Sequence, residues 1–228
     1  MNPDQSNPGA REAAKLAVSM RACLTLNTCR SDPADSAMTW RLVSGKMPEI
    51  TPEHVNKLKE PCTGFLCEIS DDIYDFDFKA FKIRDIASNE VLFNMDDSGK
   101  LVGSVEPMML EGEDMYRGIR YHFPAKFWNM KSIGTTLTFS VGDMPVRDFR
   151  MIERHYFRGK LIHSFDFTFG FVIPNSTNQW EAIYPVPKVS KKVVADILKS
   201  PWEVKSDTFF FSGRTLIKHH RAEYAYDD

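Results

Sequence analysis

The sequence lacks the features by which most enzymes, membrane-spanning proteins and nucleic-acid-binding proteins are recognised. It contains no Gly-x-Ser-x-Gly, Walker loop, Gly-x-Gly-x-x-Gly or His-Glu-x-x-His motif. No stretch approaches the roughly 20 apolar residues of a membrane span. The formal net charge is −2, without the basic excess of a general nucleic-acid binder. We therefore expect no enzyme, no integral membrane insertion and no nucleic-acid partner.

Cysteine is also sparse, and this bears on metal sites and on the redox compartment. The chain has 4 cysteines, all in its N-terminal third: Cys23, Cys29, Cys62 and Cys67. The Cys62-x4-Cys67 pair has no matching pair of histidines nearby, so we expect no zinc site and no cofactor. The first thirty residues hold no continuous apolar segment, so we expect no secretory signal and reduced thiols in the cytoplasm.

A group of potential catalytic residues occurs at His163, Ser164 and Asp166. In a β-strand, neighbouring side chains point to opposite faces, so His163 lies opposite Ser164 and Asp166. The three side chains therefore do not converge as a triad, and we assign no catalytic residues.

What the chain does have is enough apolar sequence for one core. It has 228 residues, 43% of them hydrophobic, which favours a single domain. Residues 1–48 show weak patterning and are predicted to be a variable, mobile arm, with one short helix over Glu12–Leu26. A transit peptide is an alternative for the arm, which its acidic residues disfavour. Residues 49–228 are predicted to form the domain.

From about residue 73, apolar and polar residues alternate as in half-buried strands. The parity switches between Phe78 and Phe81, which indicates a bulge or a strand buried on both faces. Residues 96–116 are predicted to be a long loop. The remaining strands are expected around Val91–Phe93, Ile119–Phe123, Ile133–Val141, Met151–Phe157, Phe165–Phe171, Trp180–Tyr184, Thr208–Phe211 and Leu216–Tyr226.

Two helices are expected outside the strands. Thr51 is an N-cap residue followed by Pro52 at the first helical position, with Glu60 near the far end. Ser190 caps a second helix that Pro201 ends. Many short strands with a single late helix predict an all-β, immunoglobulin-like sandwich of two antiparallel sheets.

The segment over residues 150–158 places a carboxylate on an apolar face. Glu153 and His155 share their parity with Met151 and Phe157, which we expect to face inward. A buried carboxylate is unfavourable unless a partner compensates it. One explanation is an Arg or Tyr on a neighbouring strand, and the other is a ligand's polar end at the mouth of an apolar pocket. The opposite face is expected to be solvated because it carries Arg150, Arg154 and Arg158.

A series of motifs runs through the predicted strands: Phe81-Lys82-Ile83-Arg84-Asp85, Val91-Leu92-Phe93, FRMIERHYFR at 149–158, SFDFTFGF at 164–171, Ile183-Tyr184, Ser206-Asp207-x-Phe209 and AEYAY at 222–226. Over about residues 50–226 these motifs closely resemble the uncoordinated-119 family. That family is the acyl-binding branch of the superfamily of the rod cyclic-GMP phosphodiesterase delta subunit.

The resemblance implies a lipid carrier. Its sandwich would admit the N-terminal myristoyl group of client proteins, such as Gα subunits and ciliary proteins, between the two sheets. The carrier would solubilise these clients in the cytoplasm and deliver them to the cilium or flagellum. An Arf-like small GTPase in its GTP form would release them.

The resemblance also implies which residues bind the ligand. Tyr121 matches a tyrosine near the lipid's polar end, and Glu153 matches an acid near the client's first residues. Phe210 and Ala182 depart from the family's usual tyrosine and histidine. The other positions that match the acyl tunnel or its surroundings are Phe78, Phe81, Phe127, Ile133, Leu137, Phe165, Tyr184, Val186 and Tyr224.

Two alternatives remain open from the sequence. The first is a prenyl-binding carrier on the same fold, which only the chemistry of the bound tail distinguishes. The second is a non-enzymatic adaptor, in which the arginine face, the N-terminal arm or the acidic loop binds a protein and the pocket is incidental.

Overall fold

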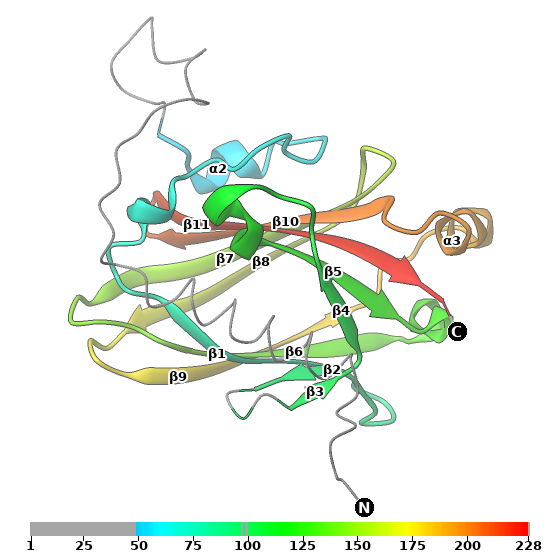
Figure 1. Cartoon of the computed structure of the whole chain (residues 1–228), viewed down its shortest axis with the longest axis horizontal. Coiled ribbons are helices and arrows are strands. Elements are labelled where there is room, and N and C mark those ends of the chain that lie inside the picture. The colour runs from blue at the N-terminus through cyan, green and yellow to red at the C-terminus, as the bar shows by residue number, and fades with distance from the viewer. Residues whose placement is uncertain (1–48, 97, 99, 228) are drawn as a thin grey trace, which may run out of the picture.

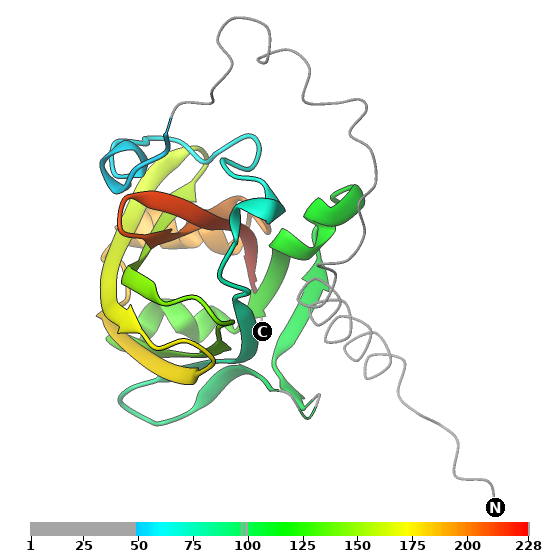
Figure 2. The same ribbon diagram turned by 90° about the vertical axis from the view of Figure 1, so that its left-hand side faces the viewer.

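A computed structural model describes residues 49–96, 98 and 100–227. Two β-sheets face each other (Figures 1 and 2). The first has the strand order β3 (Leu101–Val102), β2 (Val91–Met95), β1 (Asp77–Asp85), β6 (Ser132–Ser140) and β9 (Thr177–Pro185). The second has the order β4 (Ser104–Pro107), β5 (Gly118–Phe123), β11 (Thr215–Tyr226), β10 (Val204–Ser212), β7 (Val146–Phe157) and β8 (Lys160–Val172).

The predicted β-sandwich is confirmed, with one difference in strand direction. Eight of the nine strand pairs are antiparallel, whereas β5 pairs with β11 in parallel. A parallel pair needs a long connection, because a tight turn reverses the chain. Residues 124–214, which form most of the remaining strands, supply that connection.

Strand β1 contains the predicted bulge. Its pairing with β6 shifts register between Phe78 and Ala80. The extra residue changes the parity of the strand, so Phe78 and Phe81 both line the space between the sheets. A hairpin joins β1 to β2, with Asn89 in the left-handed region (φ 62°) at its turn.

The prediction of a long loop over residues 96–116 is wrong in part. Strands β3 and β4 lie within it, as does most of the 3₁₀ helix η2 (Gly112–Arg117). Strands of two and four residues are too short to show a period in the sequence. Gly103 joins β3 in one sheet to β4 in the other and has φ +89°.

The capping residues in the sequence predicted where the helices begin better than how long they are. Helix α2 (Pro52–Val55) begins at the predicted cap, where the Thr51 hydroxyl accepts from His54 N–H, but it ends well before Glu60. Helix α3 (Lys191–Leu198) is capped by Ser190 as predicted. The other two 3₁₀ helices are η1 (Ile69–Asp71) and η3 (Ala125–Asn129).

Residues 50–72, here called the strap, lie across the outer face of the six-stranded sheet (Figure 1). Val55 and Cys67 of the strap pack with Ile152, Phe209 and Phe211 of that sheet. This corrects the expectation that the arginine face is solvated.

Arg154 is only 4% exposed, because the strap covers it. Its guanidinium donates a 2.6 Å hydrogen bond to the Leu58 carbonyl oxygen. Arg150 is half-buried and forms a bidentate pair with Asp166, whereas Arg158 is exposed.

Within the described ranges, no helix is long and apolar enough to cross a bilayer. The predicted arm and its helix over Glu12–Leu26 lie outside the described residues.

Candidate functional site: a cavity between the sheets

A cavity of about 220 Å³ lies between the two sheets. Figure 2 shows the sheets as facing walls, with the strap outside the six-stranded one. Aligned sheets stack roughly 10 Å apart, so a slim ligand fits between them where side chains are short or turned aside. Ala80 and Ala182 are such short side chains on the five-stranded wall.

Most of the predicted lipid-binding residues line this cavity. The structure brings together Phe78, Phe81, Tyr121, Phe127, Ile133, Leu137, Phe165, Tyr184, Phe210 and Tyr224 from both sheets and from η3. They come from sequence positions up to 146 residues apart (224 − 78), and strand pairing places them on facing walls. Their role in lipid binding stays a prediction.

Val186 is the exception among the predicted lining residues. It follows β9, is 5% exposed and packs within the main core cluster rather than on the cavity wall. Its N–H donates to the Lys131 carbonyl oxygen, which fixes it beside the start of β6. The wall residues nearest to it in the sequence are Tyr184, two residues before it, and Pro187, directly after it.

One end of the cavity is aromatic. Phe123 stacks on Tyr121 and Phe127, and Tyr224 stacks on both Tyr121 and Tyr226. Burial, with a smaller contribution from the Glu153 carboxylate, raises the pKa of Tyr121 far above its usual value, so the phenol stays neutral. An uncharged aromatic wall suits an apolar chain.

The predicted inward orientation of Glu153 is confirmed. Its side chain lines the cavity and is 15% exposed. Glu153 Oε1 lies 3.0 Å from His155 Nε2, but that nitrogen makes no aligned hydrogen bond. The nearest partner is therefore a histidine two residues along the same strand. The sequence had suggested an Arg or Tyr partner on a neighbouring strand, and the structure instead places His155 of the same strand beside the carboxylate.

The polar side chains of the cavity concentrate on the six-stranded wall, and most of them escaped the sequence prediction. Thr208 is paired with Glu153 on one side and with His220 on the other. In the next row, Ser206 is paired with His155. The alternation of side chains along β10 could have identified them. Ser206, Thr208 and Phe210 are every second residue of one strand, so the predicted inward position of Phe210 implies that Ser206 and Thr208 face inward too.

The two departures from the family pattern both lie at the cavity. Ala182 and Phe210 line it from opposite sheets. Neither side chain offers a hydrogen-bond donor or acceptor. The polar groups that line the cavity include Glu153, His155 and their neighbours on the six-stranded wall.

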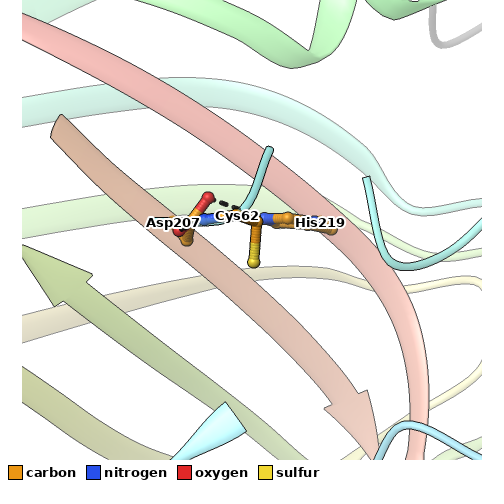
Figure 3. A group of neighbouring side chains, drawn as sticks. All are labelled: Cys62, Asp207 and His219. Carbon is orange, nitrogen blue, oxygen red and sulfur yellow. Dashed lines mark hydrogen bonds and ion pairs between the residues drawn. The ribbon is translucent and has the colours of Figure 1, made fainter. Parts of the chain in front are cut away.

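A separate group of possible metal ligands lies on the outer face, under the strap. Figure 3 shows Cys62 beside Asp207 of β10 and His219 of β11. His219 Nδ1 accepts a 3.1 Å hydrogen bond from Leu66 N–H, so its proton lies on Nε2, which is 3.0 Å from Asp207 Oδ1. Asp207 Oδ2 also accepts from Cys62 N–H at 2.9 Å.

These hydrogen bonds leave His219 without a free nitrogen lone pair for a metal. Burial and the nearby Asp207 charge also raise the pKa of the Cys62 thiol to about 12, which disfavours the thiolate that metals bind. The group therefore has a structural role: the buried side chains of Asp207 and His219 accept hydrogen bonds from the backbone of the strap.

The proposed absence of a triad at His163 agrees with the geometry. Asp166 forms its ion pair with Arg150 on the outer face. His163 instead contacts the Phe165 ring, with centroids 4.1 Å apart, and burial lowers the pKa of His163. The two side chains do not meet.

Comparison with known proteins supports a single family. The family described as "GMP-PDE, delta subunit" matches residues 70–226. "Protein unc-119 homolog B" of Homo sapiens is 43% identical over 183 residues, covering 78% of this chain and 72% of that protein. "Protein unc-119" of Caenorhabditis elegans is 40% identical over 179 residues, covering 78% and 80%. "Protein unc-119 homolog" of Drosophila melanogaster is 38% identical over 193 residues, covering 78% and 73%.

Proposed function

Because the chain belongs to the family of the GMP-PDE delta subunit, and within it to the unc-119 proteins, we propose that it carries proteins with an N-terminal acyl group. The family is one of lipid-binding carriers and is not a known enzyme family. The finer proposal is that the ligand is a myristoyl chain on the N-terminal glycine of a client.

The main support for this proposal is that the cavity has an apolar part and a polar part. One wall and one end are apolar and aromatic, whereas Glu153, His155 and Thr208 lie together on the other wall. An acylated peptide has the same division, with an apolar chain joined to polar amides. Burial of the chain contributes about 0.8 kcal/mol per CH₂ group.

A carrier must also compete with the membrane for the same chain. A single myristoyl group binds bilayers only marginally, with a constant on the order of 10⁴ M⁻¹. A cavity of modest affinity is therefore sufficient to keep an acylated protein in solution. We extend the proposal to Gα subunits and ciliary proteins as clients, to delivery from the cytoplasm to the cilium or flagellum, and to release by a GTP-bound Arf-like GTPase. The resemblance of residues 50–226 to the uncoordinated-119 family supports these details.

The test is a titration of the protein with one Gly-starting peptide in four forms: myristoylated, lauroylated, farnesylated and unmodified. We expect the two straight acyl chains to bind, the bulkier branched farnesyl chain to bind more weakly, and the unmodified peptide not to bind. Tighter binding of the farnesyl form would identify a prenyl carrier. Equal affinity for the unmodified peptide would favour an adaptor and contradict the carrier.

A pair of variants on one strand shows whether the cavity itself is the binding site. Ala182 lines the cavity, whereas Ile183 points outward and is 56% exposed. Ala182→Phe should fill part of the cavity and weaken acyl-peptide binding at least tenfold. Ile183→Phe adds a ring to the outer face and should leave the affinity unchanged. Equal effects of the two substitutions would place the ligand elsewhere.

A further inference from the structure

One end of the sandwich carries a cluster of exposed basic side chains. Figure 1 shows helix α3 at this end, beyond the ends of the strands and away from α2 and the strap. The cluster, here called the basic end, draws its residues from the β7–β8 turn, the segment after β9, and α3 with its C-cap: Arg158, Lys160, Lys188, Lys191, Lys192 and Lys199.

A hydrogen bond joins the two parts of the basic end. The Arg158 guanidinium donates a 2.9 Å hydrogen bond to the Ser200 hydroxyl oxygen, and the Arg158 backbone N–H donates to the Glu203 carbonyl oxygen at 3.3 Å. Ser200 directly follows the C-cap of α3 and is bonded back to the helix through the Ile197 carbonyl oxygen. The β7–β8 turn is therefore held against the end of the helix, and the two parts form one surface.

Helix α3 directs its lysines away from the protein. Its Ile197 is only 1% exposed and belongs to the main core cluster, against which Val193 also packs. In an α-helix, residues three, four or eight positions apart share a side. Lys191 and Lys199 therefore lie on one side of α3, and this side is exposed. The apolar side fixes the helix, and the basic side faces outward.

The positive charge of the basic end is not balanced within the described part of the chain. None of its six side chains forms an ion pair with a described residue, whereas Lys126, Lys205 and Lys218 elsewhere each have a carboxylate partner. The only acidic residues in ranges 158–161 and 186–203 are Asp196 and Glu203. The whole chain has a formal net charge of −2, so this end differs in sign from the rest.

We propose that the basic end docks the protein on the surface of a bilayer that contains anionic lipids. Clusters of about four to eight Lys and Arg residues on an amphipathic helix are typical of sites that bind acidic headgroups. This inference goes beyond acyl binding, because it requires no ligand in the cavity. It places the protein at the membrane surface itself.

The composition of the basic end favours a bilayer over an acidic protein as the partner. Five of its six basic residues are lysines. Lysine is a mobile point charge that suits a diffuse anionic surface, whereas protein interfaces are enriched in arginine and depleted in lysine. Leu161 and Leu198, which are 41% and 38% exposed, lie close in sequence to the Arg158–Ser200 contact. Exposed apolar groups beside basic ones can enter the headgroup region.

The experiment measures sedimentation of the full chain, without acylated peptide, together with vesicles. One set of vesicles is phosphatidylcholine alone, and the other mixes phosphatidylcholine with phosphatidylserine. The test variant removes three charges from α3 and its cap, and glutamine is used because it forms helices about as well as lysine. Its substitutions are Lys191→Gln, Lys192→Gln and Lys199→Gln.

A matched control removes the same charge from other parts of the surface. It carries Lys57→Gln, Lys59→Gln and Lys100→Gln, which lie in the strap and before β3 and are exposed. Both triple variants therefore have the same net charge. Any difference between them reports the position of the charges.

We expect the wild type to bind the vesicles that contain phosphatidylserine and not those of phosphatidylcholine alone. Binding should disappear in about 1 M salt, where the screening length falls to about 3 Å. The α3 variant should bind at least about tenfold more weakly, because each lost lysine removes attraction to the surface. The control should bind nearly as the wild type does.

Two results of the vesicle measurement would overturn the proposal. One is that the wild type binds neither set of vesicles. The other is an equal loss of binding in both triple variants, which would show that net charge matters and the basic end does not. Soluble polyglutamate tests the alternative partner. Binding of polyglutamate that the α3 variant loses, without binding of any vesicle, would assign this surface to an acidic protein and contradict the proposal.

A titration with the myristoylated peptide keeps this inference separate from the proposed function. The α3 variant should bind the peptide as the wild type does and melt at the same temperature, because its substitutions lie on an exposed helix face. If the wild type binds anionic vesicles but no acylated peptide, only the proposed function fails. A fall in vesicle binding that merely follows a loss of folded protein would refute docking by the basic end.

Discussion

At the scale of single residues, Glu153 distinguishes a ligand-binding role from a structural one. We expect Glu153→Gln to weaken acyl-peptide binding by about 1–3 kcal/mol, the range for losing a charge-assisted hydrogen bond. The melting temperature should change little, because Gln keeps the shape and the carboxylate makes no aligned hydrogen bond with His155. Both quantities are measured on the same preparation.

The opposite pattern would contradict a ligand-binding role for Glu153. Breaking a buried ion pair costs about 3–5 kcal/mol of stability. A large fall in the melting temperature of Glu153→Gln, with unchanged affinity per folded molecule, would show that the Glu153–His155 contact serves the fold.

His220 gives a prediction about pH. Its pKa is about 3 in the folded protein, against an ordinary value of 6.5. Below pH 6.5 the unfolded chain takes up a proton that the folded protein does not, so stability falls with pH by up to about 1.4 kcal/mol per unit. At pH 5 this loss is about 2 kcal/mol relative to pH 7.

The measurement is the free energy of unfolding of the wild type and of His220→Phe by urea at pH 7 and pH 5. The variant should lose less stability on acidification. Part of the slope should remain, because burial also lowers the pKa of His163 and His219. Identical slopes in the two proteins would show that His220 is protonated in the folded state or shielded in the unfolded one.

At the scale of elements, the crossover from β3 to β4 depends on one glycine. Gly103 has φ +89°, and a Cβ there would lie 2.7 Å from the Leu92 carbonyl oxygen. Gly103→Ala therefore adds both left-handed strain and a collision with backbone, and should cost about 3 kcal/mol or more. The free energy of unfolding in urea measures this cost.

Gly159 in the β7–β8 turn is the matched control. It has φ +75°, but a Cβ there would meet nothing within 4 Å. Gly159→Ala should therefore cost only the left-handed strain, about 1–2 kcal/mol. Equal costs at the two positions would show that the sheets adjust around Gly103.

The strap is the element that the sequence described least well. Its backbone is held by Arg154, Asp207 and His219, which lie on three strands far along the chain. Nothing in residues 50–72 alone marks them as the cover of a sheet. The spacing of the arginines on β7 predicted a solvated face. That prediction failed because alternation shows only which residues share a face, and the segment that covers this face is remote in the sequence.

At the scale of the whole molecule, the described cavity wall is formed by residues between 67 and 226. Removing residues 1–48 should therefore leave the affinity for a myristoylated peptide nearly unchanged. The measurement compares peptide titrations of the truncated and the full-length protein. A tenfold or greater loss, about 1.4 kcal/mol, would show that the N-terminal arm contributes to the binding site.

The sequence alone determined the strands that bear the core and the direction of their side chains. Alternation is a local property of an extended backbone, so it correctly placed Glu153 inward with Met151 and Phe157 and predicted the bulge after Phe78. Capping residues likewise predicted where α2 and α3 begin, because the cap hydrogen bonds span only a few residues.

Only the tertiary structure decided which of these local elements meet. Strand order, the parallel β5–β11 pair and cross-strand register place Thr208 between His220 and Glu153. The same long-range pairing puts Val186 in the core instead of the cavity and lays the strap over Arg154. These contacts depend on register between strands that are distant in the chain, which no local period encodes.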